Sequence, residues 1–196
     1  NLGGFRRTQW NATNAQLGSV SLFSISGAQF VTPLEVNIAD ATRMLIGGSS
    51  IVYESSNITT ASPTATSLGG PGANRNAMAF GSLVDPDAAY VGKNAAVYRR
   101  VGNAFVVTGA LPAGANTITD VAMDPGNPLR VYAVDDNQVF RSLDAGTTWT
   151  NVTGNIASIS SFDFRTIEYI SDPTGDRIAL GTRSGVYVAD ALASTW

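Results

Sequence analysis

The chain contains no cysteine and no histidine among its 196 residues. These two absences exclude disulfide bonds, thiolate nucleophiles, Ser-His-Asp triads and most zinc sites. Charge is also scarce, because 15 acidic and 12 basic residues give a net charge of −3 and only 14% of the residues are charged. Nearly all of the basic residues are scattered arginines, so no basic block is present that would bind nucleic acid. No apolar run reaches the roughly 18 residues that a membrane-spanning helix needs, and no membrane insertion is expected.

The composition is otherwise that of a folded protein without a recognisable cofactor motif. Hydrophobic residues make up 44% of the chain, which permits a sizeable core. The glycine-rich run at 68–76 does not lie between a strand and a helix, so it does not predict a phosphate-binding loop. We therefore predict no cofactor and no metal. The chain begins with Asn rather than Met, which indicates a removed leader or an internal fragment.

A short sequence pattern recurs four times along the chain. Each copy has an Asp turn, then a short apolar run, then a Val-Tyr or Val-Phe dipeptide. The Asp turns are Asp40-Ala41, Asp85-Pro86, Asp124-Pro125 and Asp172-Pro173. The dipeptides are Val52-Tyr53, Val97-Tyr98, Val139-Phe140 and Val186-Tyr187, at intervals of 45, 42 and 47 residues. Because a fixed order at a nearly fixed period is the mark of a repeat architecture, this pattern decides the fold prediction.

Each repeat is predicted to contain four short strands and no helix. The segments between turns are rich in Val, Ile, Tyr, Phe and Thr, and no long stretch has helical periodicity. Four strands in roughly 40–45 residues is typical of one β-propeller blade. The sequence thus predicts an all-β β-propeller of about four four-stranded blades, and the recurrence favours it over a β-sandwich. The expected blades are 15–60, 61–108, 109–155 and 156–196, with 1–14 as a stray last strand.

The third repeat contains the most specific segment of the chain. Residues 139–149 match the pattern S-x-D-x-G-x-x-W through Ser142, Asp144, Gly146 and Trp149. This segment resembles the Asp-box, or bacterial neuraminidase repeat, of sialidases, xyloglucanase-type glycoside hydrolases and sortilin-type receptors. The resemblance implies that the motif closes the hairpin between the third and fourth strands of a blade. The four residues then have structural roles, since Asp and Ser bond turn amides, Gly permits positive φ and Trp adds an apolar face.

The two ends of the chain leave the number of blades open. Residues 8–14 resemble the segment that begins at Trp149, which is why 1–14 is interpreted as a last strand. That strand either completes the fourth blade and closes a four-bladed ring, or the chain is part of a larger propeller. The resemblance favours the larger propeller, because Asp-box propellers usually have six or more blades. An open arc exposes apolar blade faces, so we expect association with the rest of a larger propeller or with copies of the chain.

The predicted ligand face is formed by the turns between second and third strands and by the loops between blades. The charged and amide side chains expected on this face are Lys93, Asp135, Asp136, Asn137 and Arg183. Asp135 and Asp136 are adjacent and point to opposite sides of a strand, so they are a poor catalytic pair for a glycosidase. With Asn137 they supply too few oxygen ligands for calcium. No catalytic residue is predicted.

These observations predict a non-catalytic binding or structural module that engages a protein or glycan partner through one loop face. The alternative is a fragment of a xyloglucanase-like glycoside hydrolase whose second carboxylate lies elsewhere in the protein; no enzymatic activity is assigned. A single Lys with abundant Ser, Thr, Asn and Gly favours an exported protein, extracellular or at the cell surface. Three N-x-Thr sequons, at 11–13, 57–59 and 151–153, carry glycans only in a host that glycosylates them.

Overall fold

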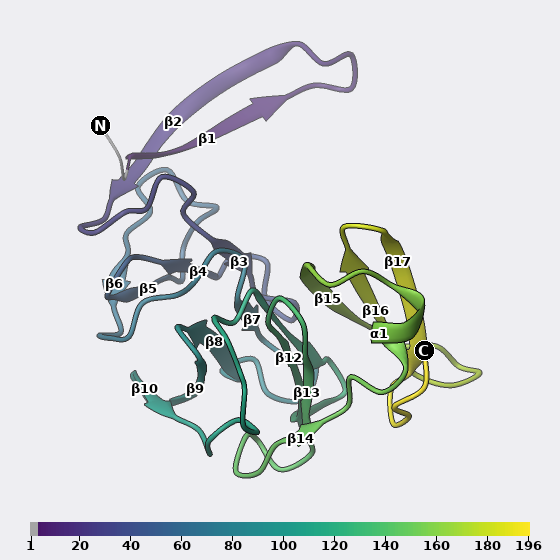
Figure 1. Cartoon of the computed structure of the whole chain (residues 1–196). Helices are drawn as coiled ribbons and strands as arrows, with labels where there is room; N and C mark the ends of the chain where they lie inside the picture. The colour runs from purple at the N-terminus through teal and green to yellow at the C-terminus, as the bar shows by residue number, and fades with distance from the viewer. Residues whose placement is uncertain (1–3) are drawn as a thin grey trace.

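A computed structural model describes residues 4–196, which form five antiparallel sheets and one four-residue helix, α1 (Ile156–Ile159) (Figure 1). The predicted all-β class is confirmed. Residues 1–3, which belong to the segment expected to be a stray last strand, lie outside the described part. Within 4–196, no helix has the length and apolar character required to cross a membrane.

Four of the sheets repeat one plan, and we call them blades 1 to 4. Blade 1 contains β3 (Leu34–Val36), β4 (Met44–Gly47), β5 (Val52–Ser55) and β6 (Thr66–Ser67). Blade 2 contains β7 (Met78–Phe80), β8 (Ala89–Lys93), β9 (Ala96–Val101) and β10 (Ala104–Val107). Blade 3 contains β11 (Asp120–Asp124), β12 (Asn127–Val134), β13 (Val139–Ser142) and β14 (Thr150–Asn151). Blade 4 has three described strands, β15 (Phe164–Ile170), β16 (Arg177–Thr182) and β17 (Gly185–Asp190).

The sequence repeat is a structural repeat. Each Asp turn joins the first two strands of a blade, and its carboxylate accepts a hydrogen bond from the amide two residues later. The distances from Oδ1 of Asp40, Asp85, Asp124 and Asp172 to that nitrogen are 2.9, 3.0, 2.8 and 2.7 Å. Such turns reverse the chain by local chemistry, which is why a sequence pattern can predict them.

The core lies between neighbouring blades, because side chains alternate along each strand. Val139 on β13 packs with Leu180 and other residues of blade 4. Its neighbour Phe140 points the opposite way and packs with Tyr90 and Val97 of blade 2. We call the surface of a blade that meets the next blade along the chain its forward face. The first strands, β3, β7, β11 and β15, lie side by side in that order and form an arc.

The N-terminal segment differs from its prediction. β1 (Gly4–Trp10) pairs with β2 (Gln16–Ser24) in a separate two-stranded hairpin that points away from the blades (Figure 1). The reason is local, since Asn11 Oδ1 accepts hydrogen bonds from the amides of Thr13 and Ala15 and turns the chain back on itself. The prediction that this segment is the last strand of a blade is therefore wrong. The alternative of a four-bladed ring depended on that strand, so it is wrong as well. The sheets form an open arc, consistent with part of a larger propeller.

The blade boundaries shift for the same reason. Residues 16–24, expected in blade 1, belong to the hairpin. The short strand β6, expected in the second blade, is the fourth strand of blade 1 and pairs with β5.

Candidate functional site

The segment 139–149 closes the hairpin between β13 and β14, the third and fourth strands of blade 3. Ser142 Oγ donates to Asp144 Oδ1 at 2.8 Å and accepts the Gly146 amide at 2.8 Å. The Asp144 carboxylate accepts the Thr148 amide at 2.8 Å and the Thr148 hydroxyl at 2.6 Å. The hydrogen bond from the Thr148 side chain is the main reason why the pKa of Asp144 is lowered. These contacts are internal to the turn, so the turn has a structural role.

The same hairpin is attached to blade 2. Trp149 is buried, packs in the core between blades 2 and 3, and donates from Nε1 to Thr108 Oγ1 at 3.2 Å. Gly146 has φ +82°, and a Cβ there would lie 2.6 Å from Thr108 Cγ2. Glycine is therefore required twice, by the backbone conformation and by the close approach of blade 2.

Amide side chains connect the loops at the other end of the strands. Gln29, before β3, donates to the carbonyl oxygen of Ala73 at 2.9 Å. Asn74, before β7, donates to the carbonyl oxygen of Ile118 at 2.9 Å. Each bond links the connector that enters one blade to the connector that enters the next. These hydrogen bonds fix the positions of the connecting loops relative to one another.

These connectors surround a depression of about 550 Å³, which we call the loop depression. Its polar lining residues are Gln29, Asn74, Arg75, Asn76, Thr117, Thr119, Asp136, Asp163 and Arg165. Arg75 is exposed and makes no ion pair within residues 4–196. Phe162 is exposed and does not itself line the depression, but its ring centroid lies 6.2 Å from that of Phe164, which does. Polar donors next to an exposed aromatic ring suit a polar ligand with an apolar face.

Of the side chains predicted for the ligand face, Asp136 lines the loop depression. Asp136 is exposed and accepts a hydrogen bond from Asn116 Nδ2 at 2.9 Å. Asp135 is fully buried and accepts the amides of Asn116, Asn137 and Gln138 at 2.8, 2.9 and 2.6 Å. A carboxylate with both oxygens engaged by backbone amides shapes its turn and is not available to a ligand.

The other predicted side chains lie around the same end of the molecule without lining the depression. Lys93 is the half-buried last residue of β8, and Asn137 is half-buried in the turn after β12. Arg183 is exposed in the turn after β16, where its amide donates to the carbonyl oxygen of Asp163 at 3.2 Å. The structure thus places this set at the loop end but does not bring it together as one site.

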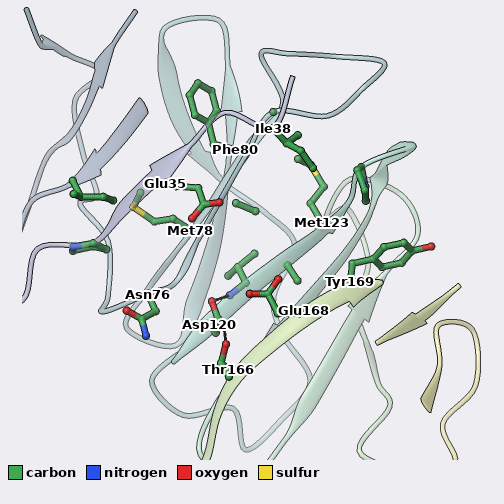
Figure 2. Close-up of a pocket in the computed structure, with 17 residues that line it drawn as sticks. Glu35, Ile38, Asn76, Met78, Phe80, Asp120, Met123, Thr166, Glu168 and Tyr169 are labelled. Atoms are coloured by element: carbon green, nitrogen blue, oxygen red, sulfur yellow. Dashed lines mark hydrogen bonds between the residues drawn. The ribbon is translucent and has the colours of Figure 1, made fainter. Parts of the chain in front are cut away.

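A second depression, of about 330 Å³, lies along the concave side of the arc, and we call it the inner groove (Figure 2). It is lined by the first strands of all four blades and contains three carboxyl groups, those of Glu35, Asp120 and Glu168. Asn76 lines both depressions. The sequence analysis did not select any of these carboxyl groups.

Asp120 connects the first strands of blades 3 and 4. Its Oδ2 accepts the Thr166 hydroxyl at 2.6 Å and its Oδ1 accepts the Val121 amide at 2.8 Å (Figure 2). Oδ2 also accepts the Ile167 amide at 2.9 Å. Burial raises the pKa of Asp120 to about 6, although these hydrogen bonds act in the opposite direction. The carboxyl group is buried and bonded on both oxygens, which gives it an inter-blade structural role.

Glu35 and Glu168 occupy the same position of the repeat. Glu35 pairs with Leu45 and Glu168 pairs with Ala179, each the second residue of its repeat's apolar run. At this position blades 2 and 3 have Ala79 and Ala122, which pair with Tyr90 and Tyr132. An alignment of the four repeats would have identified Glu35 and Glu168, because each is a charged residue at a position where the other two repeats have alanine.

The pKa values of the carboxyl groups in the inner groove are all raised. Burial is the main reason why the pKa of half-buried Glu35 is raised to about 7, and the negative charges of Glu168 and Asp120 add to it. Glu168 is exposed, but partial loss of hydration raises the pKa of its carboxyl too. A raised pKa favours the neutral carboxyl that a general acid needs. Within residues 4–196, no group of three or more acidic side chains is placed to hold a metal ion.

Comparison with known proteins gives a structural likeness. No protein-family model and no curated protein matches the chain. Among solved structures, an ancestral GH74 enzyme, from a β-propeller glycoside hydrolase family, is similar over 79% of the chain with a TM-score of 0.57 and 16% identity. The chain has a β-propeller fold. The propeller seen here spans 24% of the length of that enzyme, and at 16% identity the likeness shows the fold alone.

Proposed function

We propose that this propeller is a non-catalytic binding module of an exported protein, and that it binds a glycan in the loop depression. The observation that carries the proposal is a depression of about 550 Å³ lined by Arg75, which makes no ion pair within residues 4–196, with the exposed ring of Phe162 lying 6.2 Å from that of the lining residue Phe164. Planar donors and amides bond sugar hydroxyls, and an aromatic ring packs against the apolar face of a sugar. A glycoside hydrolase among proteins of similar fold supports a carbohydrate as the ligand.

A non-catalytic role is supported by the groups that line the loop depression. Its carboxylates are Asp136, which bonds Asn116, and Asp163, which forms an ion pair with Arg165 at 2.6 Å. The hydrogen bond from Arg165 lowers the pKa of Asp163, so this carboxyl stays ionised and cannot serve as a general acid near neutral pH. The depression therefore has the groups to bind a sugar and lacks a proton donor to cleave one.

The test is a glycan array probed with the purified chain, followed by calorimetric titration of a retained oligosaccharide. We expect Arg75→Ala and Phe162→Ala each to weaken binding at least tenfold. Leu143→Ala is the matched control, because Leu143 is about as exposed as Phe162 but lies on the hairpin turn at the opposite end of the strands. Unchanged affinity in both loop variants would contradict the proposal, and co-purification of a protein in place of a glycan would identify a protein partner.

A second candidate function, glycoside hydrolysis, is supported by the inner groove. Glu35, with its raised pKa, would act as the general acid, and Glu168 at the equivalent position of blade 4 would be the opposing carboxylate. Asp135 has no part in this candidate, because backbone amides occupy both of its oxygens. Reducing-sugar release from xyloglucan that is abolished by both Glu35→Gln and Glu168→Gln would establish it. Release that survives in either variant would reject it.

A further inference from the structure

The turns at one end of blades 1 to 3 carry large apolar side chains that are exposed to solvent. This end lies opposite the loop depression, because it contains the Asp turns between first and second strands and the hairpin between β13 and β14. Five side chains there are more than half exposed, and we call them the apolar row: Ile38 (54%), Leu83 (69%), Val84 (66%), Leu129 (51%) and Leu143 (52%).

Backbone hydrogen bonds connect the apolar row across the three blades. The Ile38 amide in blade 1 donates to the carbonyl oxygen of Phe80 in blade 2 at 3.1 Å. The Leu83 amide in blade 2 donates to the carbonyl oxygen of Pro125 in blade 3 at 2.7 Å. Ile38, Phe80 and Pro125 also line the inner groove together. The turns of neighbouring blades therefore form one surface.

Blade 3 extends this surface to its outer hairpin. Leu129 follows the Asp turn of blade 3, and its carbonyl oxygen accepts the Ala145 amide of the hairpin at 2.9 Å. Leu143 belongs to the same hairpin. Single exposed apolar residues are ordinary, but a connected set on turns that are bonded to one another marks an interaction surface.

The most exposed part of the apolar row is the tip of a closed turn. Leu83 and Val84 lie between Ser82 and Asp85, and the Ser82 amide donates to the carbonyl oxygen of Asp85 at 2.9 Å. The Asp85 amide donates in turn to Ser82 Oγ at 2.9 Å. The two apolar side chains are thus presented on a fixed backbone, which lowers the entropic cost of binding a partner.

The segments that carry the apolar row have an excess of negative charge. Five aspartates and three arginines lie in these segments, which are residues 37–43, 81–88, 124–130 and 141–149. Asp40, Asp85 and Asp144 each lie within two residues of a member of the row, and they make no ion pair within residues 4–196. A hydrogen bond from a threonine hydroxyl is the main reason why the pKa of Asp40 and that of Asp144 are lowered. These carboxylates are therefore ionised at neutral pH.

The arginines of the same segments are half-buried and already bonded inside the protein. Arg43 forms an ion pair with Asp87 at 2.6 Å. Arg130 forms an ion pair with Asp124 at 3.0 Å. The third, Arg141, donates to carbonyl oxygens of blade 4. The uncompensated charge beside the apolar row is therefore negative.

We propose that the apolar row docks a segment of a partner protein whose apolar side chains are flanked by lysine or arginine. The apolar side chains would cover the row, and the cations would lie against its unpaired carboxylates. This inference goes beyond the proposed glycan binding and does not depend on it, because the loop depression lies at the other end of the strands.

The charge and the position of the apolar row argue against other occupants. Its carboxylates would repel an anionic lipid surface or a nucleic acid. A second copy of the chain would bring the same carboxylates together, since a two-fold interface uses one patch twice. A further blade would stack on the faces of the sheets and leave these strand ends uncovered.

Selection of random dodecapeptides displayed on phage tests the proposal with the purified 196-residue chain as bait. The library is first depleted on a double variant, Leu83→Ser with Val84→Ser, which changes only exposed turn residues. We expect the recovered peptides to combine leucine, isoleucine, phenylalanine or tryptophan with lysine or arginine. The affinity of one recovered peptide, synthesised with a fluorescent label, is then measured by anisotropy.

Three variants separate the apolar contribution from the charge. We expect Leu83→Ser to weaken binding about tenfold, and Asp40→Asn combined with Asp85→Asn to weaken it about threefold and reduce its dependence on salt. Asparagine keeps the Oδ1 acceptor that both turns use, so the turns are preserved. Leu17→Ser is the matched control, because Leu17 is 62% exposed but lies on the β1–β2 hairpin, and it should leave the affinity unchanged.

Four outcomes would overturn the proposal. The first is recovery of no peptide, or of peptides without lysine and arginine. The second is an affinity that Leu83→Ser leaves unchanged. The third is a dimer in sedimentation that Leu83→Ser abolishes, which would identify a second copy as the occupant. The fourth is cosedimentation with phosphatidylserine vesicles that Leu83→Ser abolishes, which would identify a lipid surface.

Discussion

Asp120 on β11 accepts a hydrogen bond of 2.6 Å from the hydroxyl of Thr166 on β15 and so joins the innermost strands of two blades. The same oxygen accepts a hydrogen bond from the buried Ile167 amide, which would have no acceptor without it. Neighbouring blades are thus held by a buried polar contact as well as by apolar packing. The inner groove owes part of its shape to this contact.

Removal of this carboxyl group should destabilise the arc. Asp120→Ala leaves the Ile167 amide and the Thr166 hydroxyl without an acceptor, at a cost of about 1–3 kcal/mol. Thr166→Val removes one of these bonds only and should cost less. Urea unfolding of both variants measures the difference, and an effect of Asp120→Ala no larger than that of Thr166→Val would show that Asp120 does not hold the blades together.

The inner groove should make stability fall as pH rises. Glu35 has a folded-state pKa of about 7, above its ordinary value of 4.5. A raised carboxyl pKa means that its contribution is fully present below about 4.5 and is lost as pH rises through 7. We expect Glu35→Gln to reduce the loss of stability between pH 5 and pH 8 by on the order of 1 kcal/mol. Urea midpoints at the two pH values test this, and an identical pH slope in the variant would contradict it.

The hairpins of blades 2 and 3 offer a matched pair of glycines, Gly102 and Gly146. Gly146 has φ +82° and no room for a Cβ beside Thr108, whereas Gly102 has φ +59° and nothing within 4 Å of such an atom. Gly102→Ala should cost only the backbone strain, about 1 kcal/mol, and Gly146→Ala should cost about 1–3 kcal/mol more because blade 2 must move. Thermal unfolding compares the two, and equal costs would mean that the contact with Thr108 is not close.

A buried ion network joins blades 1 and 2. Glu54 contacts Arg43 at 2.6 Å and Arg100 at 2.9 Å, and all three side chains are largely shielded from water. Glu54→Ala leaves Arg100 without its close partner and Arg43 with Asp87 alone, and it should destabilise the protein by about 3 kcal/mol. The control is Asp190→Ala, because Asp190 lies 3.9 Å from Arg177 in a pair exposed at both ends and should matter by less than about 0.5 kcal/mol. Similar unfolding midpoints for both variants would show that the Glu54 network contributes nothing.

Local chemistry explains which parts of the fold were predictable. Asp124 and its sister residues make turns from hydrogen bonds to the amide two residues later, and Ser142 and Asp144 close the hairpin of blade 3 with bonds that span at most four residues. Resemblance over a few residues misled the prediction at Trp10, because the Asn11 turn redirected a segment that looks like the start of a last strand.

The inner groove could not be predicted in the same way. Glu35, Asp120 and Glu168 belong to three different blades, and no local pattern surrounds them. Only the stacking of the blades buries Glu35, which is the main reason why its pKa is raised, and brings the negative charges of Glu168 and Asp120 near it. The same holds for the loop depression, whose lining comes from successive connectors rather than from the turn that contains Asp135 and Asp136.

The sequence by itself determined the repeat, the four-stranded blade, its turns and the direction in which each side chain points, because all of these follow from chain reversal and strand alternation. Only the tertiary structure decided which blade faces are covered, which carboxyl groups share a groove and where the N-terminal strand pairs. These features depend on contacts between residues far apart in the chain, whose free energy exists only after the blades have stacked.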